Sequence, residues 1–440
     1  MRAGGTAGEA LADLGQHGRP HRFWTPLRIV LAIAAVTFSL SLVAKSPCAA
    51  GAWWDSPRDY AYACHTDLAN DYSMSGLAER VPAWDSDSDQ HVVRTDLTVP
   101  DAALSYVAAV SAQTLSGGVD IDDRRASPVV DLASDDDLRN EAIGYLAVVA
   151  AIQLVAFLLG VLLLVRANPT RPYAMTAVAG APIVVFTTLL GWDMVLFALV
   201  CATWWAWSRG HASLAGAFIG VAGAMAFWPL LILPALGLAG LRHGGVDRVG
   251  RTLGVSIVAW VCCVLPLVVI SGGAYFDPLG TYSDTDVGTG SIWDVGADLG
   301  FAPTPDAMKL ILVVGMVVVL MGASVFALKS RIAPDAPAIA LLILVGWFVL
   351  TKTYEPQYAL ALLPIAALAW PHWRDLLIWQ AGELVFLFAV SWNAGGYTLD
   401  SGDVDRVLPF AILVRVAAQL WLASRVILGH RHADERIPTR

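Results

Sequence analysis

The segment Ala212–Ala239, "ASLAGAFIGVAGAMAFWPLLILPALGLA", runs for 28 residues without a charged side chain. Basic stretches flank it on both sides, at Ser208–His211 and Arg242–Arg251. Because basic loops stay in the cytoplasm, both ends of the segment are expected on that side. It must then cross the membrane an even number of times. We predict a short hairpin bent near Trp228 and Pro229, since proline lacks a backbone donor and kinks helices.

The whole chain has the composition of a membrane protein. It has 440 residues, of which 57% are hydrophobic and 15% charged, whereas ordinary globular chains are roughly half apolar and a quarter charged. Apolar runs recur along most of its length, which predicts an all-α polytopic membrane protein. With the hairpin we expect about twelve passes, with helices near 27–44, 143–165, 172–190, 193–208, 252–271, 308–328, 336–351, 356–370, 376–392 and 407–427.

The basic residues also predict the orientation. The first apolar run, Leu27–Ala44, follows three arginines, and Lys45–Cys48 is a poor signal-peptidase site. We therefore expect a retained first helix after a cytoplasmic tail, 1–26, and a second cytoplasmic tail at 429–440. The protein would lie in the cytoplasmic membrane with both termini inside.

Acidic residues mark the regions expected outside. Residues 46–142 hold 16 Asp and 2 Glu against 6 Arg, which predicts an outer loop subdomain and not a nucleic-acid partner. An apolar stretch at 100–115 predicts either a helix on the membrane surface or a core helix of this subdomain. The other two outer regions are 272–307 and the turn Thr351–Glu355. That turn carries Lys352 against the positive-inside pattern.

Two cysteines fall in the first outer region. Cys48 and Cys64 lie 16 residues apart in a compartment that permits disulfides. We expect a bridge, and the alternative is a pair of free thiols. The acidic run at 85–89 lacks the glycine and final glutamate of an EF-hand, so it is interpreted as surface charge. We expect no metal and no cofactor.

Asp67 follows Cys64 among aromatic and aliphatic residues. If partial burial raised its pKa, it could act as a general base; otherwise it belongs to a solvated acidic loop. His65, Asp71 and Arg80 are expected in the shell around it.

Three boxes resemble a known family in their order and spacing. They are "SPCAAGAWWDSPRDYAYACHTDLANDY" at 46–72, a Trp-Asp helix with a proline hairpin at Gly191–Pro234, and "TKTYEPQYALALLPIAALA" at Thr351–Ala369. Together they resemble actinobacterial membrane proteins of glycosyltransferase family 87. The resemblance implies a GT-C fold and a polyprenyl-phosphate-mannose-dependent mannosyltransferase acting on the outer face of the membrane.

The resemblance also implies roles for single residues. Asp67 matches the catalytic aspartate of its box, and Asp193 matches the aspartate of the Trp-Asp helix. Pro356, Gln357 and Tyr358 match the Pro-Gln-Tyr box, so Gln357 and Tyr358 are expected to contact the donor.

Two departures from the family pattern bear on the chemistry. His65-Thr66 replaces the usual Tyr-Ser, and the hairpin has Met225–Trp228 where relatives commonly carry Lys or Arg just before the proline. The donor phosphate then needs another cation, for which Lys352 is the candidate. The alternative is an exposed lysine at the rim.

A lipid-phosphate donor has a stable leaving group, so one carboxylate suffices to deprotonate the acceptor, and direct attack inverts the anomeric centre. The expected partners are that donor, a lipid or glycan acceptor and membrane lipids. Two other functions stay open. A lipid or polyprenyl transporter would need charged residues buried within helices, of which few are evident. The missing hairpin cation favours a non-catalytic scaffold for envelope assembly.

Overall fold

The computed structural model describes residues 23–49, 57–81, 99–116, 121–126, 136–272, 274–276, 287–398 and 406–435. These residues form helices, and no strand occurs among them. Six helices are long and apolar enough to cross a membrane, as expected for a multi-pass helical membrane protein. They are α2 (Pro26–Ala49), α8 (Asp136–Ala167), α14 (Val246–Ile270), α17 (Pro305–Lys329), α20 (Trp373–Ala394) and α21 (Val407–Glu435).

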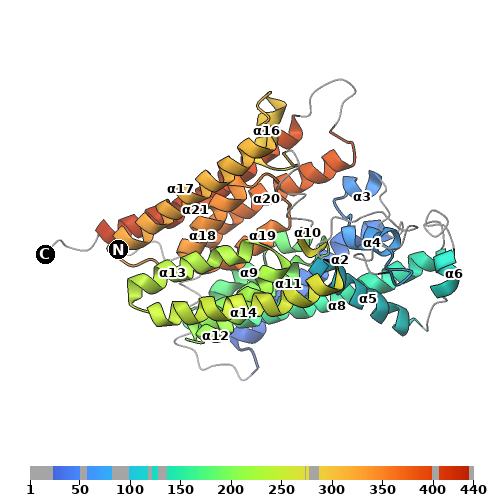
Figure 1. Cartoon of the computed structure of the whole chain (residues 1–440), viewed down its shortest axis with the longest axis horizontal. Coiled ribbons are helices and arrows are strands. Elements are labelled where there is room, and N and C mark those ends of the chain that lie inside the picture. Colours follow the sequence, from blue (N-terminus) through green and yellow to red (C-terminus); the bar gives the residue numbers. More distant parts are fainter. Residues whose placement is uncertain are drawn as a thin grey trace.

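Shorter helices complete the bundle (Figure 1). The helix predicted at 172–190 is broken at Gly180 and before Pro182, because proline starts a new helix more readily than it continues one. The hairpin bends where it was predicted, since one limb ends at Met225 and a 3₁₀ turn begins at Trp228. The short elements are η1 (Pro172–Met175), α9 (Thr176–Ala179), α10 (Pro182–Thr187), α11 (Asp193–Ser208), α12 (Ala212–Met225), η2 (Trp228–Leu231), α13 (Ile232–His243), α18 (Ala336–Leu350) and α19 (Tyr358–Ala369).

Small residues let the hairpin limb α12 lie very close to α14. A Cβ atom added at Gly216 would come within 2.3 Å of the main-chain oxygen of Thr252, and one at Gly220 within 2.4 Å of that of Ser256. The Thr252 hydroxyl also donates to the main-chain oxygen of Ala212 over 3.1 Å. Close backbone approach through small residues is a common way for helices to associate in a membrane.

Four helices gather at one end of the bundle, around the first part of α8 (Figure 1). We call this the α4 end. Its small apolar core combines Leu68 and Tyr72 with Ala108, Leu138 and Tyr145. The helix expected near 100–115 therefore packs one face inside the protein; whether its other face meets a membrane stays a prediction. The four helices are α3 (Pro57–Ala61), α4 (Asp67–Met74), α5 (Val99–Leu115) and α6 (Ile121–Ala126), and η3 (Ala274–Phe276) and α16 (Ile292–Asp298) lie elsewhere in the chain.

The close contact between α12 and α14 makes a direct prediction about stability. Replacing Gly220 with Leu should destabilise the protein by about 1–3 kcal/mol, because the new side chain overpacks the interface. The measurement is thermal unfolding of the purified protein in detergent. Gly254→Leu is the control, since Gly254 lies on the exposed face of α14 with no atom within 4 Å of an added Cβ. Equal melting temperatures for the two variants would contradict this packing.

Candidate functional site

The end of the first helix differs from the prediction in a way that matters for the site. Helix α2 continues to Ala49, five residues past the predicted end at Ala44, so Lys45 and Cys48 lie in its last turns. The Lys45 side chain is only 2% exposed. Its ammonium donates to the main-chain oxygen of His65 over 2.8 Å. A buried amine needs such a partner, because leaving it unpaired away from water is costly.

Asp67 begins α4 and lies close enough to Lys45 for its charge to act on the Lys45 ammonium. Its side chain is exposed, which agrees with the alternative of a solvated acidic residue and not with the partial burial considered for a general base. The reason is that α4 turns Leu68, Ala69 and Tyr72 inward, all with no exposed area, and leaves its first residue at the surface. The carboxylate is thus accessible and lies beside a buried cation.

A cavity of about 470 Å³ lies between α2 and α8 and is lined by Lys45 and Thr66 but not by Asp67. Its rim is polar and includes Lys45, Ser46 and Thr66. Leu42 and Ile143 line it and are 42% and 41% exposed, so the wall continues onto the outside of the helices. The rest of the wall is apolar and comes from Phe38, Leu146, Ala147, Ala150, Ala151 and Leu154.

The loop between α10 and α11 closes one side of the cavity. Thr66 donates its hydroxyl to the main-chain oxygen of Leu189, which also lines the cavity. Leu189 has a φ of +64°, a left-handed conformation that is unusual for a residue other than glycine. Gln153 holds the loop in place, because its amide nitrogen donates to the oxygen of Gly191 over 2.8 Å and its amide oxygen accepts from the Leu189 N–H over 3.2 Å. The same loop leads directly into Asp193.

Asp193 is the first residue of α11, as predicted, and it is half-buried. The charges of Glu355 and Asp101 both act on it, so the turn after α18 and the start of α5 approach the start of α11. The indole N–H of Trp192 donates to the Ser105 hydroxyl over 2.9 Å, which fixes α5 against this point. Asp193 therefore lies in an acidic part of the site, connected to Asp67 through the loop described above.

The turn Thr351–Glu355 and the start of α19 carry the other residues expected to contact a donor. Lys352 is buried, with 2% of its surface exposed, so the alternative of an exposed lysine at the rim does not hold. The Gln357 amide donates to Glu355 over 2.5 Å. The ring of Tyr358 stacks on Phe348 with a centroid distance of 5.5 Å. Gln357 is thus engaged with the acidic part of the site, and the Tyr358 ring packs inward.

The remaining residues expected in the shell have different surroundings. The His65 ring lies 4.8 Å from the Tyr60 ring, next to the cavity rim. Asp71 is buried and its charge acts on Tyr145. Arg80 donates through Nε to the Gln113 side chain over 2.7 Å. None of the site residues predicted from the sequence lines the cavity, and this holds for Asp67, Asp193 and Lys352 as well as for Asp71 and Arg80.

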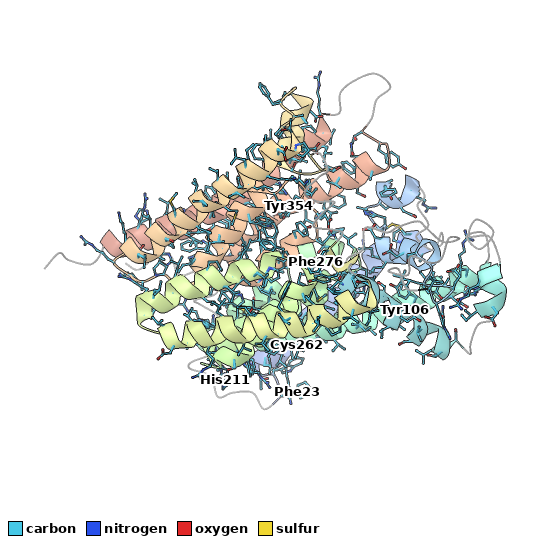
Figure 2. All side chains as sticks on the ribbon, in the orientation of Figure 1. Phe23, Tyr106, His211, Cys262, Phe276 and Tyr354 are labelled. Atoms are coloured by element: carbon cyan, nitrogen blue, oxygen red, sulfur yellow. A yellow bond between two sulfur atoms is a disulfide. The ribbon has the colours of Figure 1, made fainter. Side chains whose placement is uncertain are left out.

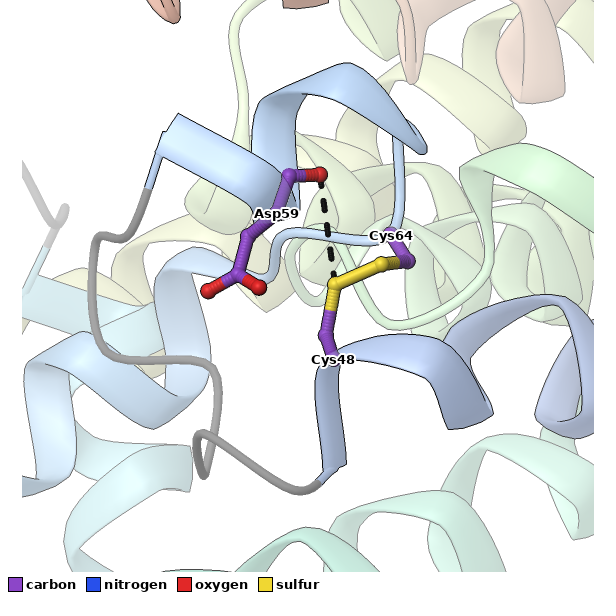
Figure 3. A group of neighbouring side chains, drawn as sticks. All are labelled: Cys48, Asp59 and Cys64. Carbon is purple, nitrogen blue, oxygen red and sulfur yellow. Dashed lines mark hydrogen bonds between the residues drawn. A yellow bond between two sulfur atoms is a disulfide. The ribbon is translucent and has the colours of Figure 1, made fainter.

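A disulfide joins Cys48 at the end of α2 to Cys64, three residues before α4 (Figure 3). The Cα atoms are 5.8 Å apart. Asp59 lies beside the bridge, and the three potential ligand atoms are all within 4.8 Å of one another. Metal ions bind cysteine as the thiolate, and both sulfurs here are consumed by the bridge. The cluster therefore does not fit a metal ion while the disulfide is present.

No protein-family model matches the chain, and a search of curated proteins found no match. The case for a function therefore depends on the geometry of the site. The resemblance to family 87 supplies only an expectation.

Two features of the structure are not predicted from the sequence. Lys45 enters the prediction only as part of an uncleaved junction, although a lone lysine just after an apolar run and away from the basic loops is a usable signal. Glu383 on α20 and Arg415 on α21 are 1% and 0% exposed inside helices that are long enough to span a membrane. The sequence predicts few buried charges. Glu383 and Arg415 are buried because α20 packs against α21.

The disulfide makes a testable contribution to this site. Replacing Cys48 and Cys64 together with Ser should lower the free energy of unfolding by about 3 kcal/mol, because the bridge closes a loop with a sequence separation of 16 residues. Denaturant unfolding of the purified protein measures the change. Cys201→Ser, at a buried cysteine outside the bridge, is the control for loss of a sulfur atom. A double variant as stable as the unaltered protein would contradict a bridge that stabilises the fold.

Proposed function

We propose that this protein is a membrane glycosyltransferase of the GT-C type that moves a sugar from a polyprenyl phosphate to a lipid or glycan acceptor. The observation that carries the proposal is the apolar cavity between α2 and α8, which the buried Lys45 side chain lines, together with the exposed Asp67 carboxylate near Lys45. The resemblance to family 87 supplies mannose as the expected sugar.

The cavity suits a lipid that carries a phosphate. Its wall is apolar and continues onto the helix surface at Leu42 and Ile143, where an isoprenoid chain could enter from the membrane. Lys45 lines the same cavity and places one positive charge where a phosphate would sit. We propose that Lys45 replaces the hairpin cation that Met225–Trp228 lacks, and that Lys352 is a second cation for the donor.

The chemistry needs one base. Asp67 would take the proton from the acceptor hydroxyl as that oxygen forms a bond to the anomeric carbon. The bond between this carbon and the phosphate oxygen breaks at the same time, and polyprenyl phosphate leaves as an anion facing Lys45. Direct displacement inverts the anomeric centre. An exposed carboxylate is accessible to an acceptor arriving from water or from the membrane surface.

We also propose that the α4 end faces outward, which agrees with the acidic balance of residues 46–142. The six long helices, the shorter apolar helices and the hairpin would then make the twelve expected passes. Both chain ends would lie in the cytoplasm.

A lipid transporter is the second candidate, because Glu383 and Arg415 are buried inside helices, a feature that such proteins share. Neither residue lines the cavity between α2 and α8. Transfer of a sugar in solution would distinguish an enzyme from a transporter or a scaffold.

The base assignment is tested by in vitro transfer from labelled polyprenyl-phosphate-mannose to a panel of membrane lipids. Asp67→Asn should lower the rate by about 10²–10⁴-fold, the usual contribution of a general base. Asp306→Asn is the matched control, because this carboxylate has a side chain that is 95% exposed and pairs with Lys309, one turn away on α17. Unchanged transfer by Asp67→Asn would remove Asp67 as the base, and no transfer by the unaltered protein would favour a scaffold or a transporter.

The proposed binding of a lipid chain in the cavity between α2 and α8 can be tested separately. Ala151→Trp should fill the cavity and raise the KM for a long polyprenyl donor by about tenfold, with a smaller effect on a short-chain donor, because only the long chain needs the full groove. Val155→Trp is the control, since Val155 lies one turn further along α8, is 65% exposed and does not line the cavity. The same KM increase for both donors, or for both variants, would contradict a chain-binding role.

A further inference from the structure

The C-terminal helices enclose a group of polar side chains around Glu383. Its carboxylate accepts from the Trp379 indole N–H over 2.8 Å and from the Gln419 amide over 2.7 Å. The other carboxylate oxygen accepts from the Tyr354 hydroxyl over 3.1 Å. All four side chains are at most 2% exposed, and Figure 2 shows Tyr354 inside the C-terminal helices. Burying such a polar group in a membrane protein costs free energy, which indicates that the group has a function.

Arg415 lies over the face of the Tyr354 ring. Its guanidinium carbon is 3.6 Å from the centre of the Tyr354 ring and 4.9 Å from that of Phe386. The Arg415 nitrogens make no hydrogen bond to any residue that the structure describes. The ring faces and the charge of Glu383 are therefore what stabilise this cation. Tyr354 is thus held between a buried positive charge on its face and a buried negative charge at its hydroxyl.

The main chain of Tyr354 belongs to the turn that carries Lys352. The Tyr354 N–H donates to the oxygen of Thr289 over 3.3 Å, and the Gly288 N–H donates to the oxygen of Lys352 over 2.9 Å. Gly290 has a φ of +83°, and an added Cβ there would come within 2.5 Å of the Tyr354 oxygen. The segment 288–290 thus lies directly against the turn, so a displacement of Tyr354 would move Lys352 with it.

We propose that Glu383 and Arg415 are positioning residues, which clamp Tyr354 from two sides and thereby hold the turn Thr351–Glu355 at the site. Each charge is tolerated because the other is present, and removing one leaves an uncompensated buried charge. This proposal depends on the proposed function at one point only, which is the assignment of Lys352 to donor binding. Its effect on the position of the turn can be measured without any transfer reaction.

The experiment uses the accessibility of the turn as its readout. A Lys352→Cys reporter is placed in a Cys262→Ser/Cys263→Ser background, and its reaction with a membrane-impermeant maleimide is followed in isolated membranes or in detergent. Because Lys352 is 2% exposed, slow labelling is expected with the clamp intact. Tyr354→Phe, Glu383→Gln or Arg415→Met should each speed labelling at least tenfold. The double variant Glu383→Gln/Arg415→Met should label at a rate within about threefold of that of the reporter with the clamp intact, because neither charge is then left without the other.

Gln380→Leu is the matched control. Gln380 is 1% exposed on the same helix, and its side-chain oxygen accepts from the Ile183 N–H over 3.3 Å, on α10 and away from Tyr354. Labelling should not change in this variant. The native Cys201, which has no exposed area, should stay unreactive to a membrane-permeant maleimide in every variant and so reports that the fold is intact.

Two results would overturn the clamp: unchanged labelling in all three single variants, or an equal increase in Gln380→Leu. A double variant that stays as fast as the single ones would overturn the charge pairing. The proposed function fails independently, through absence of sugar transfer by the unaltered protein. Faster labelling without any sugar transfer would therefore support the clamp and contradict the proposed enzymatic function.

Discussion

The hydrogen bond from the Lys45 ammonium to the main-chain oxygen of His65 is the interaction on which the site depends. It places the residues just before α4 directly over the end of α2. The Cys48–Cys64 disulfide makes the same connection covalently, and Thr66 extends it to the loop before α11. A buried amine strongly prefers such an acceptor to none, so this arrangement has few alternatives. The result is one positive charge at the end of an apolar cavity, with a carboxylate beside it.

The polar part of the site is held by two buried charge systems on different helices. Lys45 supports the α2 side, and the pair Glu383 and Arg415 supports the side of the turn at Lys352. The charge of Glu355 on that turn acts on Asp193. Charges are costly inside a membrane protein, and Lys45, Glu383 and Arg415 each contact a segment next to or containing a proposed functional residue. This distribution is easier to explain by a chemical task than by stability alone.

Much of the fold could be predicted because apolar runs, basic loops and prolines act locally. The long helices, the bend at Trp228 and the start of α11 at Asp193 all follow from residues that are near in sequence. Lys45 could not be placed in the same way, since its burial depends on an acceptor twenty residues further on. Glu383 and Arg415 became visible only once α20 and α21 were paired. The exposure of Asp67 likewise could not be predicted, because it depends on which face of α4 packs into the core at the α4 end.

Photo-crosslinking with a diazirine-bearing isoprenoid phosphate would test the central claim most directly. The account predicts that the label attaches to α2 between Phe38 and Ala49 and to α8 between Ile143 and Leu154, the two walls of the cavity. Excess unlabelled polyprenyl phosphate should prevent the attachment, and Lys45→Met should reduce it strongly. Attachment mainly to the lipid-facing surfaces of α14 and α17, insensitive both to the competitor and to Lys45→Met, would contradict a phosphate-lipid site between α2 and α8.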